Sequence, residues 1–269
     1  INRFLKNTTL NLNSRFYAGL IQEGAGIDYN GNDNNTVHVE IKFMHRPEIF
    51  AHEYSLTPNY WEQGTWNNTM SLGLQHRYQY IHGNGVMNFA LRSSTIFSDS
   101  YFANFTFSAV NKNAIGKFDF NTRTYLCIGT GNTPPESKLY LAGASPEDLM
   151  NNRFTRASGF FPDAWTTIGN TTNHFQQGGG LNLRGNSGYT AVETTSDGQS
   201  YLIYNGNTGA AVNSELEFDK LIKFRPKLLR NTWHMDSYLF ADAGSMAYTN
   251  LNNKTSWSSI RADAGFGFA

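Results

Sequence analysis

The histidines and acidic residues are the first candidates for chemistry in this 269-residue chain. His45, Glu48, His52 and Glu53 lie close together, but they do not form the His-Glu-x-x-His spacing that places two zinc ligands and a base on one helix face. We therefore interpret these four residues as polar side chains near a strand turn. The sequence predicts no metal site from them.

Catalytic constellations are equally hard to find. Asp99, Asp119, Glu215 and Asp236 form no recognisable carboxylate pair, and neither Gly-x-Ser-x-Gly nor a phosphate-binding Gly-x-x-x-x-Gly-Lys-Ser/Thr occurs. The single Cys127 excludes an internal disulfide framework and a cysteine-rich metal site. We expect that this chain is not an enzyme and uses no cofactor, and we leave open what a longer parent polypeptide does.

The residues with the most specific spacing are an arginine and several carboxylates in the last third of the chain. Arg184-Gly185 follows the glycine run Gly178 to Gly180, and Asp242 lies in the pattern Phe240-Ala241-Asp242-Ala243-Gly244. A guanidinium can hold a carboxylate through two parallel hydrogen bonds, which is directional and stronger than a neutral hydrogen bond. The chemistry available to such residues is therefore the fixing of one segment against another.

Composition indicates what kind of scaffold positions these residues. Only 39% of the residues are hydrophobic and 16% charged, whereas aromatic residues reach 14%. Disordered chains are poor in aromatics and rich in charge. The 21 basic and 21 acidic residues cancel, so nothing indicates a nucleic-acid partner. A sheet with one face in lipid and the other in water needs this mixture of aromatic, apolar and uncharged polar residues.

Period-two alternation dominates the sequence and predicts strands with one apolar face. At 36–44 the residues Val37, Val39, Ile41 and Phe43 alternate with polar ones. Many such segments run about 9–12 residues, the length that a tilted strand needs to cross a bilayer. We expect about fourteen strands, near 2–11, 14–23, 35–44, 51–58, 69–81, 86–96, 100–111, 116–128, 137–143, 173–183, 199–206, 209–221, 234–246 and 258–269.

Two stretches do not fit the alternation. Residues 24–34 are rich in Gly, Asn and Asp and are expected to form a loop. Ser145-Pro146-Glu147-Asp148 is a plausible helix start, and residues 144–198 are expected to form one long loop region that carries Arg184-Gly185. We interpret this region as an extracellular loop or a short plug helix.

A soluble β-sandwich or propeller is the main alternative for the fold. The length of the strands argues against it, and so does the clustering of aromatic residues at strand ends, as an interfacial girdle requires. No blade-length repeat supports a propeller. The predicted fold class is therefore all-β, a transmembrane antiparallel β-barrel of about sixteen strands when complete, occupying residues 1–269 as one domain.

Four motifs in order resemble the Omp85 superfamily of outer-membrane barrels. They are the segment from His174 to Gly185, Asn213 to Phe218, Phe240 to Gly244, and Ser259 to Phe268. The resemblance covers about 95 residues, and the upstream part is similar only in its strand pattern. In that family the Arg-Gly motif lies on a long loop that folds back into the barrel lumen.

The resemblance implies roles for individual residues. Arg184 would be the loop arginine, Asp242 its partner and Glu217 a second partner, with Gly185 permitting a tight turn. Phe240 and Gly244 would complete the strand motif. One departure is Asn186, where the family has Tyr or Phe, and Tyr189 could supply the missing ring. The family also has one more strand after the loop, and the sequence starts without a signal peptide, so we expect it to be incomplete at both ends.

The resemblance suggests three functions. The first is an Omp85-like protein that assists the insertion or translocation of outer-membrane or secreted proteins. The second is a barrel that anchors a separate N-terminal domain, because residues 145–185 also resemble Bacteroidota barrels linked to gluzincin (M1) peptidase-like domains. The third is a structural subunit of an outer-membrane complex. All three imply the bacterial outer membrane, a lipid bilayer with a lipopolysaccharide leaflet, and other outer-membrane or assembly proteins as partners.

Overall fold

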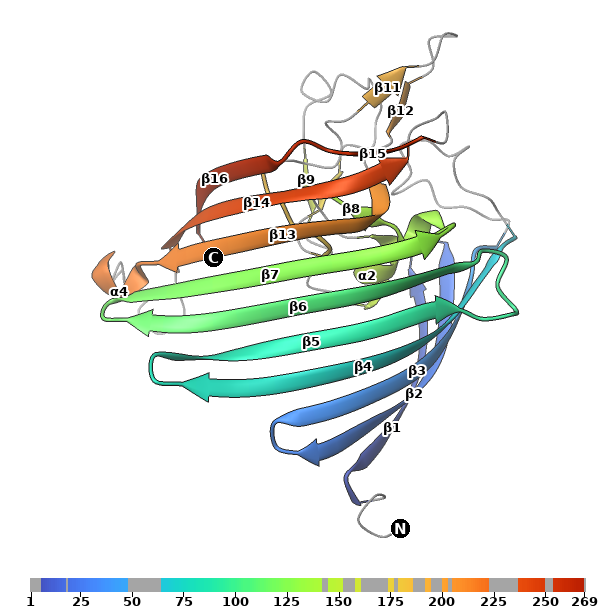
Figure 1. Cartoon of the computed structure of the whole chain (residues 1–269), viewed down its shortest axis with the longest axis horizontal. Helices are drawn as coiled ribbons and strands as arrows, with labels where there is room; N and C mark the ends of the chain where they lie inside the picture. Colours follow the sequence, from blue (N-terminus) through green and yellow to red (C-terminus); the bar gives the residue numbers. More distant parts are fainter. Residues whose placement is uncertain are drawn as a thin grey trace, which may run out of the picture.

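The computed structural model describes residues 6–17, 19–47, 64–141, 145–151, 158–160, 174–176, 179–185, 192–194, 200–202, 205–222, 237–249 and 254–268. Twelve strands of these residues form one antiparallel sheet that curves into a wall (Figure 1). The antiparallel β-architecture expected from the alternation is confirmed. Among the described residues, β1 at one edge is not paired with β15 or β16 at the other, so the sheet is not closed.

Consecutive hairpins build most of the wall. Its first seven strands are β1 (Thr8–Tyr17), β2 (Leu20–Asn32), β3 (Asn35–His45), β4 (Trp66–Tyr80), β5 (Gly83–Ser94), β6 (Phe102–Ile115) and β7 (Phe118–Gly131). The wall continues with β13 (Asn205–Glu217), which pairs with β7 and with the two-residue strand β8 (Leu139–Tyr140). Its far end consists of β14 (Ser237–Thr249), β15 (Thr255–Trp257) and β16 (Arg261–Phe268).

The two faces of the wall differ completely in polarity. One cross-strand row from β1 to β7 is apolar at every position: Leu10, Ile27, Val39, Leu72, Leu91, Phe105 and Ile128. The next row, on the opposite face, is Asn11, Gly26, Glu40, Ser71, Arg92, Asn104 and Gly129. Since cross-strand partners share a face, the alternation in the sequence becomes one apolar and one polar surface.

The apolar surface points outward and is exposed. Leu12, Phe16 and Phe266 keep 70% or more of their surface accessible, which is far from what a water-soluble sheet face tolerates over many strands. Lipid is the environment in which such a surface is stable. No helix among the described residues is long and apolar enough to cross a membrane.

Connection lengths differ between the two ends of the wall. The turns at 33–34, 81–82 and 116–117 are tight, and all lie at the same end (Figure 1). At the other end, β3 and β4 are joined by residues 46–65, and β7 and β13 by residues 132–204. The difference is not uniform, because residues 218–236 between β13 and β14 lie at the end of the tight turns, whereas residues 18–19 between β1 and β2 lie at the other end.

Described parts of the connection between β7 and β13 lie against the concave side of the wall. The connection contains the 3-10 helix η3 (Pro135–Ser137), β8, and the helix α2 (Pro146–Asn151). It also contains two small sheets: β9 (Ser158–Phe160) with β10 (His174–Gln176), and β11 (Val192–Thr194) with β12 (Ser200–Leu202). A core cluster joins this segment to the wall: Leu139, Leu141, Leu181 and Leu183 pack on Cys127, Ala211 and Met246.

Several expected elements differ from the structure. Residues 24–32, expected to form a loop, belong to β2, and only 33–34 form a turn. Gly24 and Gly26 face the lumen, where a Cβ on Gly24 would lie 2.8 Å from the Asn13 amide, so close packing explains these two glycines. The strand expected at 137–143 is reduced to β8, and 199–206 splits into β12 and the start of β13. The strand expected at 51–58 lies outside the described residues.

Candidate functional site

Arg184 lies at the centre of a compact cluster on the inner face of the wall. Its Nε and Nη2 each donate a hydrogen bond of 2.8 Å to Asp242, and its backbone N–H donates to the same carboxylate at 3.2 Å. Nη1 donates to Glu215, and the guanidinium lies 4.1 Å from the ring centroid of Phe240. We call Arg184, Glu215, Phe240 and Asp242 the Arg184 cluster.

Strand register explains why these wall residues converge. Asn213 is paired with Asp242, and Glu215 with Phe240, on the adjacent strands β13 and β14. All four are separated by even steps along their strands, so they project from the same face. The Asp242 carboxylate is fully buried and the Glu215 side chain is 36% exposed, so Asp242 is the partner that water screens least.

The inserted residues 179–185 are held on both sides of Arg184. Leu181 and Leu183 are fully buried in the core cluster, and Leu183 N–H donates to Leu141 O at 3.1 Å. Arg123 donates from Nη2 to Gly180 O at 2.6 Å, and Asn213 donates to Asn182 O at 2.9 Å. These contacts fix the backbone that carries the Arg184 guanidinium.

Gly185 lies in a turn, but the reason for glycine there is close approach. Its φ is not in the left-handed region, whereas a Cβ at this position would lie 2.6 Å from the Cβ of Asp263 on β16. The other motif glycine is also confined, since a Cβ on Gly244 would lie 2.7 Å from Ala210 O. Both glycines allow chain segments to pack directly against each other.

The structure assigns the second carboxylate differently from the sequence. Glu217, the expected second partner, accepts a hydrogen bond of 2.6 Å from Asn121. The carboxylate that contacts Arg184 beside Asp242 is Glu215, one inward-facing position earlier on β13. Both residues face the lumen with period two, so alternation alone does not distinguish them. Asn186 and Tyr189 lie outside the described residues.

The ion pairs change the acid–base behaviour of the arginine. Burial disfavours the charged guanidinium, but hydrogen bonds and charge from Asp242, together with the charge of Glu215, outweigh it and raise the pKa of Arg184 above its ordinary value. Arg184 therefore stays a cation. The chemistry of the cluster is therefore that of a fixed ion pair, which can hold a segment in place.

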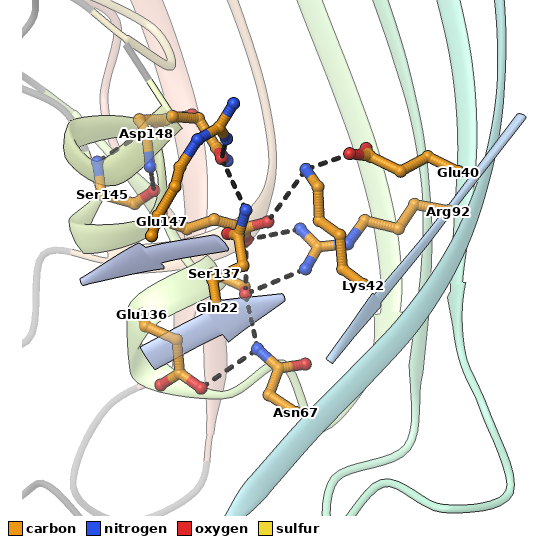
Figure 2. Close-up of polar contacts among 12 residues, drawn as sticks. Gln22, Glu40, Lys42, Asn67, Arg92, Glu136, Ser137, Ser145, Glu147 and Asp148 are labelled. Carbon is orange, nitrogen blue, oxygen red and sulfur yellow. Dashed lines mark hydrogen bonds and ion pairs between the residues drawn. The ribbon is translucent and has the colours of Figure 1, made fainter. Parts of the chain in front are cut away.

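A second set of contacts fixes helix α2 to the other half of the wall (Figure 2). Glu147 accepts hydrogen bonds from Arg92 Nη1 at 2.7 Å and Ser137 Oγ at 2.8 Å, and Lys42 Nζ lies 3.7 Å away. At the end of α2, Asn151 accepts from Gln22 at 3.0 Å and from Arg15. We call Lys42, Arg92, Ser137 and Glu147 the α2 cluster.

The 3-10 helix η3 extends this contact region. Buried Glu136 pairs with Arg46 and accepts from Asn67 Nδ2 at 3.0 Å. Asn67 also donates to Ser137 Oγ at 2.8 Å, which links η3 with the α2 cluster. The wall residues come from β1 to β5, whereas the partners of Arg184 come from β13 and β14.

Local sequence explains why α2 starts where it does. The Ser145 hydroxyl accepts a hydrogen bond from Asp148 N–H at 3.1 Å, and the Asp148 carboxylate accepts from Ser145 N–H at 3.3 Å. This reciprocal capping satisfies two otherwise unpaired donors of the first turn. The helix start expected at Ser145-Pro146-Glu147-Asp148 is thus present in the structure as α2.

The pKa values of the acidic residues in this region are shifted in opposite directions. Burial raises the pKa of Glu147, but Arg92, Lys42 and Ser137 outweigh it and hold that pKa below its ordinary value. Burial, and then the negative charge of Glu147, raise the pKa of Asp148. Burial also raises the pKa of Glu136, against the charge of Arg46. Glu147 is therefore the carboxylate that the wall cations favour most.

Sequence reasoning missed the α2 cluster, although part of the signal was there. Lys42 and Arg92 occupy polar positions of alternating strands, which places them on the lumen face. Nothing in their spacing indicated Glu147 as the partner, because the ion pairs join residues 55 or more positions apart. His45, another early candidate, stacks on Trp66 with 4.3 Å between centroids, while Glu48, His52 and Glu53 lie outside the described residues.

The comparisons with known proteins give a coarse likeness. No family model and no curated protein matches the chain. Among solved structures, the chain is similar to the crystal structure of BamA from Haemophilus ducreyi lacking POTRA domains 1–3, with a TM-score of 0.49 and 13% identity. The match covers 96% of this chain and 51% of that one, so this chain spans about half the length of the BamA chain.

Proposed function

We propose that residues 1–269 form one outer-membrane β-barrel domain of an Omp85-like protein, with residues 144–198 as a long loop region inserted in the lumen. We further propose that the parent protein assists insertion or translocation of other outer-membrane or secreted proteins. The observation that carries this proposal is the contact between Arg184 of the inserted segment and Asp242 of the Phe-x-Asp-x-Gly strand, with two bonds of 2.8 Å. The resemblance in sequence implies this pair.

The geometry favours an assembly or scaffold role over a passive pore. The inserted segment is held by an ion-pair cluster on each half of the wall, and its leucines form a core with wall residues. A pore for free diffusion needs an open lumen, which such a segment fills. The lipid bilayer of the outer membrane is the partner that the exposed apolar face fits.

A second candidate function is an anchor for a separate domain, with hydrolysis, if any, in that domain. The α2 cluster favours this alternative, because a plug fixed by buried ion pairs makes the barrel a rigid support. Within the described residues no group of three or more potential metal-ligating side chains lies together. A structural subunit of a larger complex is compatible with the same observation.

Depletion of the full-length protein in its own bacterium tests the proposal. Outer-membrane fractions are compared by quantitative proteomics and by gels of boiled and unboiled samples. An assembly function predicts that several unrelated barrel proteins fall together, and that wild-type protein restores them better than Arg184→Ala. If other barrels stay unchanged while a domain attached to this chain disappears from the membrane fraction, the anchor function replaces the assembly function.

A further inference from the structure

The inserted segment and the wall carry complementary charges where α2 meets β1 to β5. On the segment, Glu136 and Glu147 face the wall, and on the wall Arg15, Arg46, Lys42 and Arg92 contact the segment. Glu40 is the wall carboxylate in this contact region, and it shares Lys42 with Glu147 at 3.1 and 3.7 Å. The wall is thus basic where the segment is acidic.

Glu147 fills the centre of this basic surface. Its carboxylate accepts from Arg92 and Ser137, and only 5% of the residue surface is exposed. A carboxylate with two cations and a hydroxyl around it has the surroundings that an anion-binding site provides. A group of the chain itself occupies the place, and tethering gives it a high effective concentration.

Space for a larger or second occupant lies next to Glu147. A lumenal cavity of about 300 Å³ is bordered by Lys42, Arg92 and Lys138 and by Glu147 and Asp148. Much of its remaining lining is small or uncharged: Ser71, Ala90, Asn104, Thr106 and Thr133. Withdrawal of α2 would join this cavity to the volume of the helix and remove Glu147 and Asp148, while Lys42 and Arg92 would stay on the wall with Glu40 beside Lys42.

We propose that α2 is a tethered plug that closes an anion-selective passage, and that Glu147 occupies the position a passing or docking anionic group takes once α2 has left. The selectivity comes from Lys42 and Arg92, which project from wall strands and therefore do not leave with the plug. Rings of basic residues select anions in pores because they lower the electrostatic barrier for negative charge. This activity goes beyond protein assembly and does not depend on it.

Conductance of the full chain in planar bilayers tests the proposal, with a KCl gradient as the probe. Glu147→Arg places a third cation beside Arg92 and Lys42, so the ratio of docked to undocked α2 should fall at least about tenfold. Open events should become correspondingly more frequent, with a reversal potential of the sign for chloride. Arg92→Glu combined with Glu147→Arg restores an ion pair and should return the frequency toward that of wild type.

Two further variants make the result specific. Asp119→Arg makes the same charge change next to the turn between β6 and β7, at a residue paired with Lys220, and should leave α2 docked. If Glu147→Arg gives no barrel whose gel mobility shifts on boiling, Glu147→Gln is tested in its place. The expected increase in the frequency of open events is then smaller.

Two outcomes overturn the proposal. One is a folded Glu147 variant whose conductance equals that of wild type, which means that α2 does not close the passage. The other is an open channel that is unselective or prefers cations, which means that Lys42 and Arg92 do not form the selective site. Neither outcome bears on the depletion experiment, so the two proposals can fail separately.

Discussion

Replacing Arg184 by alanine removes the cation that three groups of the wall surround. Asp242 then keeps a buried carboxylate without its two guanidinium bonds, and Phe240 loses its cation–π contact at 4.1 Å. Asp242 still has the backbone N–H of residue 184 as a donor, at 3.2 Å. The main cost is therefore one buried negative charge left without its guanidinium partner, with only the backbone N–H of residue 184 and the Asn213 side chain as neutral donors.

The size of the effect follows from burial. Removing one partner of a buried ion pair costs about 3–5 kcal/mol, but this site is only partly shielded, because Glu215 is 36% exposed. We expect a loss of about 2–3 kcal/mol in the free energy of docking residues 179–185. Arg184→Ala combined with Asp242→Asn should lose less than Arg184→Ala alone, because no buried charge is left behind.

Proteolysis of the folded barrel measures this free energy. When the opening of a segment is fast relative to cleavage, the cleavage rate tracks the open population, so 2 kcal/mol corresponds to about 30-fold faster cleavage. The protease should have broad specificity, because Arg184→Ala would remove a cleavage site of an arginine-specific protease. The mobility shift between boiled and unboiled samples should persist, since none of the pairs that hold the sheet is touched.

Lys220→Ala is the matched control for loss of a cation. Lys220 donates to Asp119 at 2.7 Å, but its side chain is 45% exposed, so the pair contributes less than about 1 kcal/mol. If Arg184→Ala changes the cleavage rate no more than Lys220→Ala does, the cluster does not hold the segment. If the Arg184→Ala, Asp242→Asn double variant is cleaved faster than Arg184→Ala, the loss of stability does not come from an unpaired buried Asp242 carboxylate.

Three other perturbations test separate parts of the structure. Gly185→Ala should weaken docking of residues 179–185 by about 1–3 kcal/mol, because the new methyl group meets Asp263; equal cleavage rates in variant and wild type would contradict this. The pKa of Glu147 is lowered in the folded protein, so its carboxylate contributes fully to the docking of α2 above pH 4.5, the ordinary pKa of a glutamate. This contribution is lost as the pH falls through the lowered pKa. Hydrogen exchange of α2 should show this loss in wild type and not in Glu147→Gln. Leu72→Arg, on the outward apolar row, should destabilise the barrel in lipid by about 2–4 kcal/mol, whereas Ser71→Arg on the lumen face should cost much less, as measured by denaturant unfolding in vesicles.

The wall was accessible to sequence reasoning because its signal repeats. A period of two, maintained from 36 to 44 and again at 70–80, assigns faces correctly even where strand ends are misplaced by several residues. Residues 24–32 were misread because Gly and Asn were taken as turn formers. In a lumen-facing row they serve close packing instead, and Gly26 and Asn11 are cross-strand partners there.

The inserted segment was less accessible because its structure depends on distant residues. Arg184 and Asp242 could be named from the resemblance, but the choice between Glu215 and Glu217 depends on how deep the segment reaches into the lumen. The strands expected at 173–183 and 199–206 show the same limit, since the described residues there form the three-residue strands β10 and β12 and the first two residues of β13. Tertiary contacts override local pattern in such stretches.

The two clusters lie on opposite halves of the wall, and this has a consequence for the order of folding. Contacts of α2 reach back to β1 and β2, and Arg15 and Asn151 are 136 positions apart. Arg184 needs β13 and β14, which come later in the chain. Closing such long loops is slow, whereas each hairpin of the wall joins neighbours in sequence.

The lumen therefore fills last, after strands at both ends of the chain have paired. An assembling barrel passes through a stage with a formed wall and an unseated segment, in which the basic surface near Lys42 and the carboxylates near Arg184 are both in water. Weakening either cluster should then accelerate the loss of the seated segment and leave the rate of wall formation nearly unchanged. Seating of the inserted segment would therefore be the last step of assembly, and a seated segment would indicate that the wall is complete.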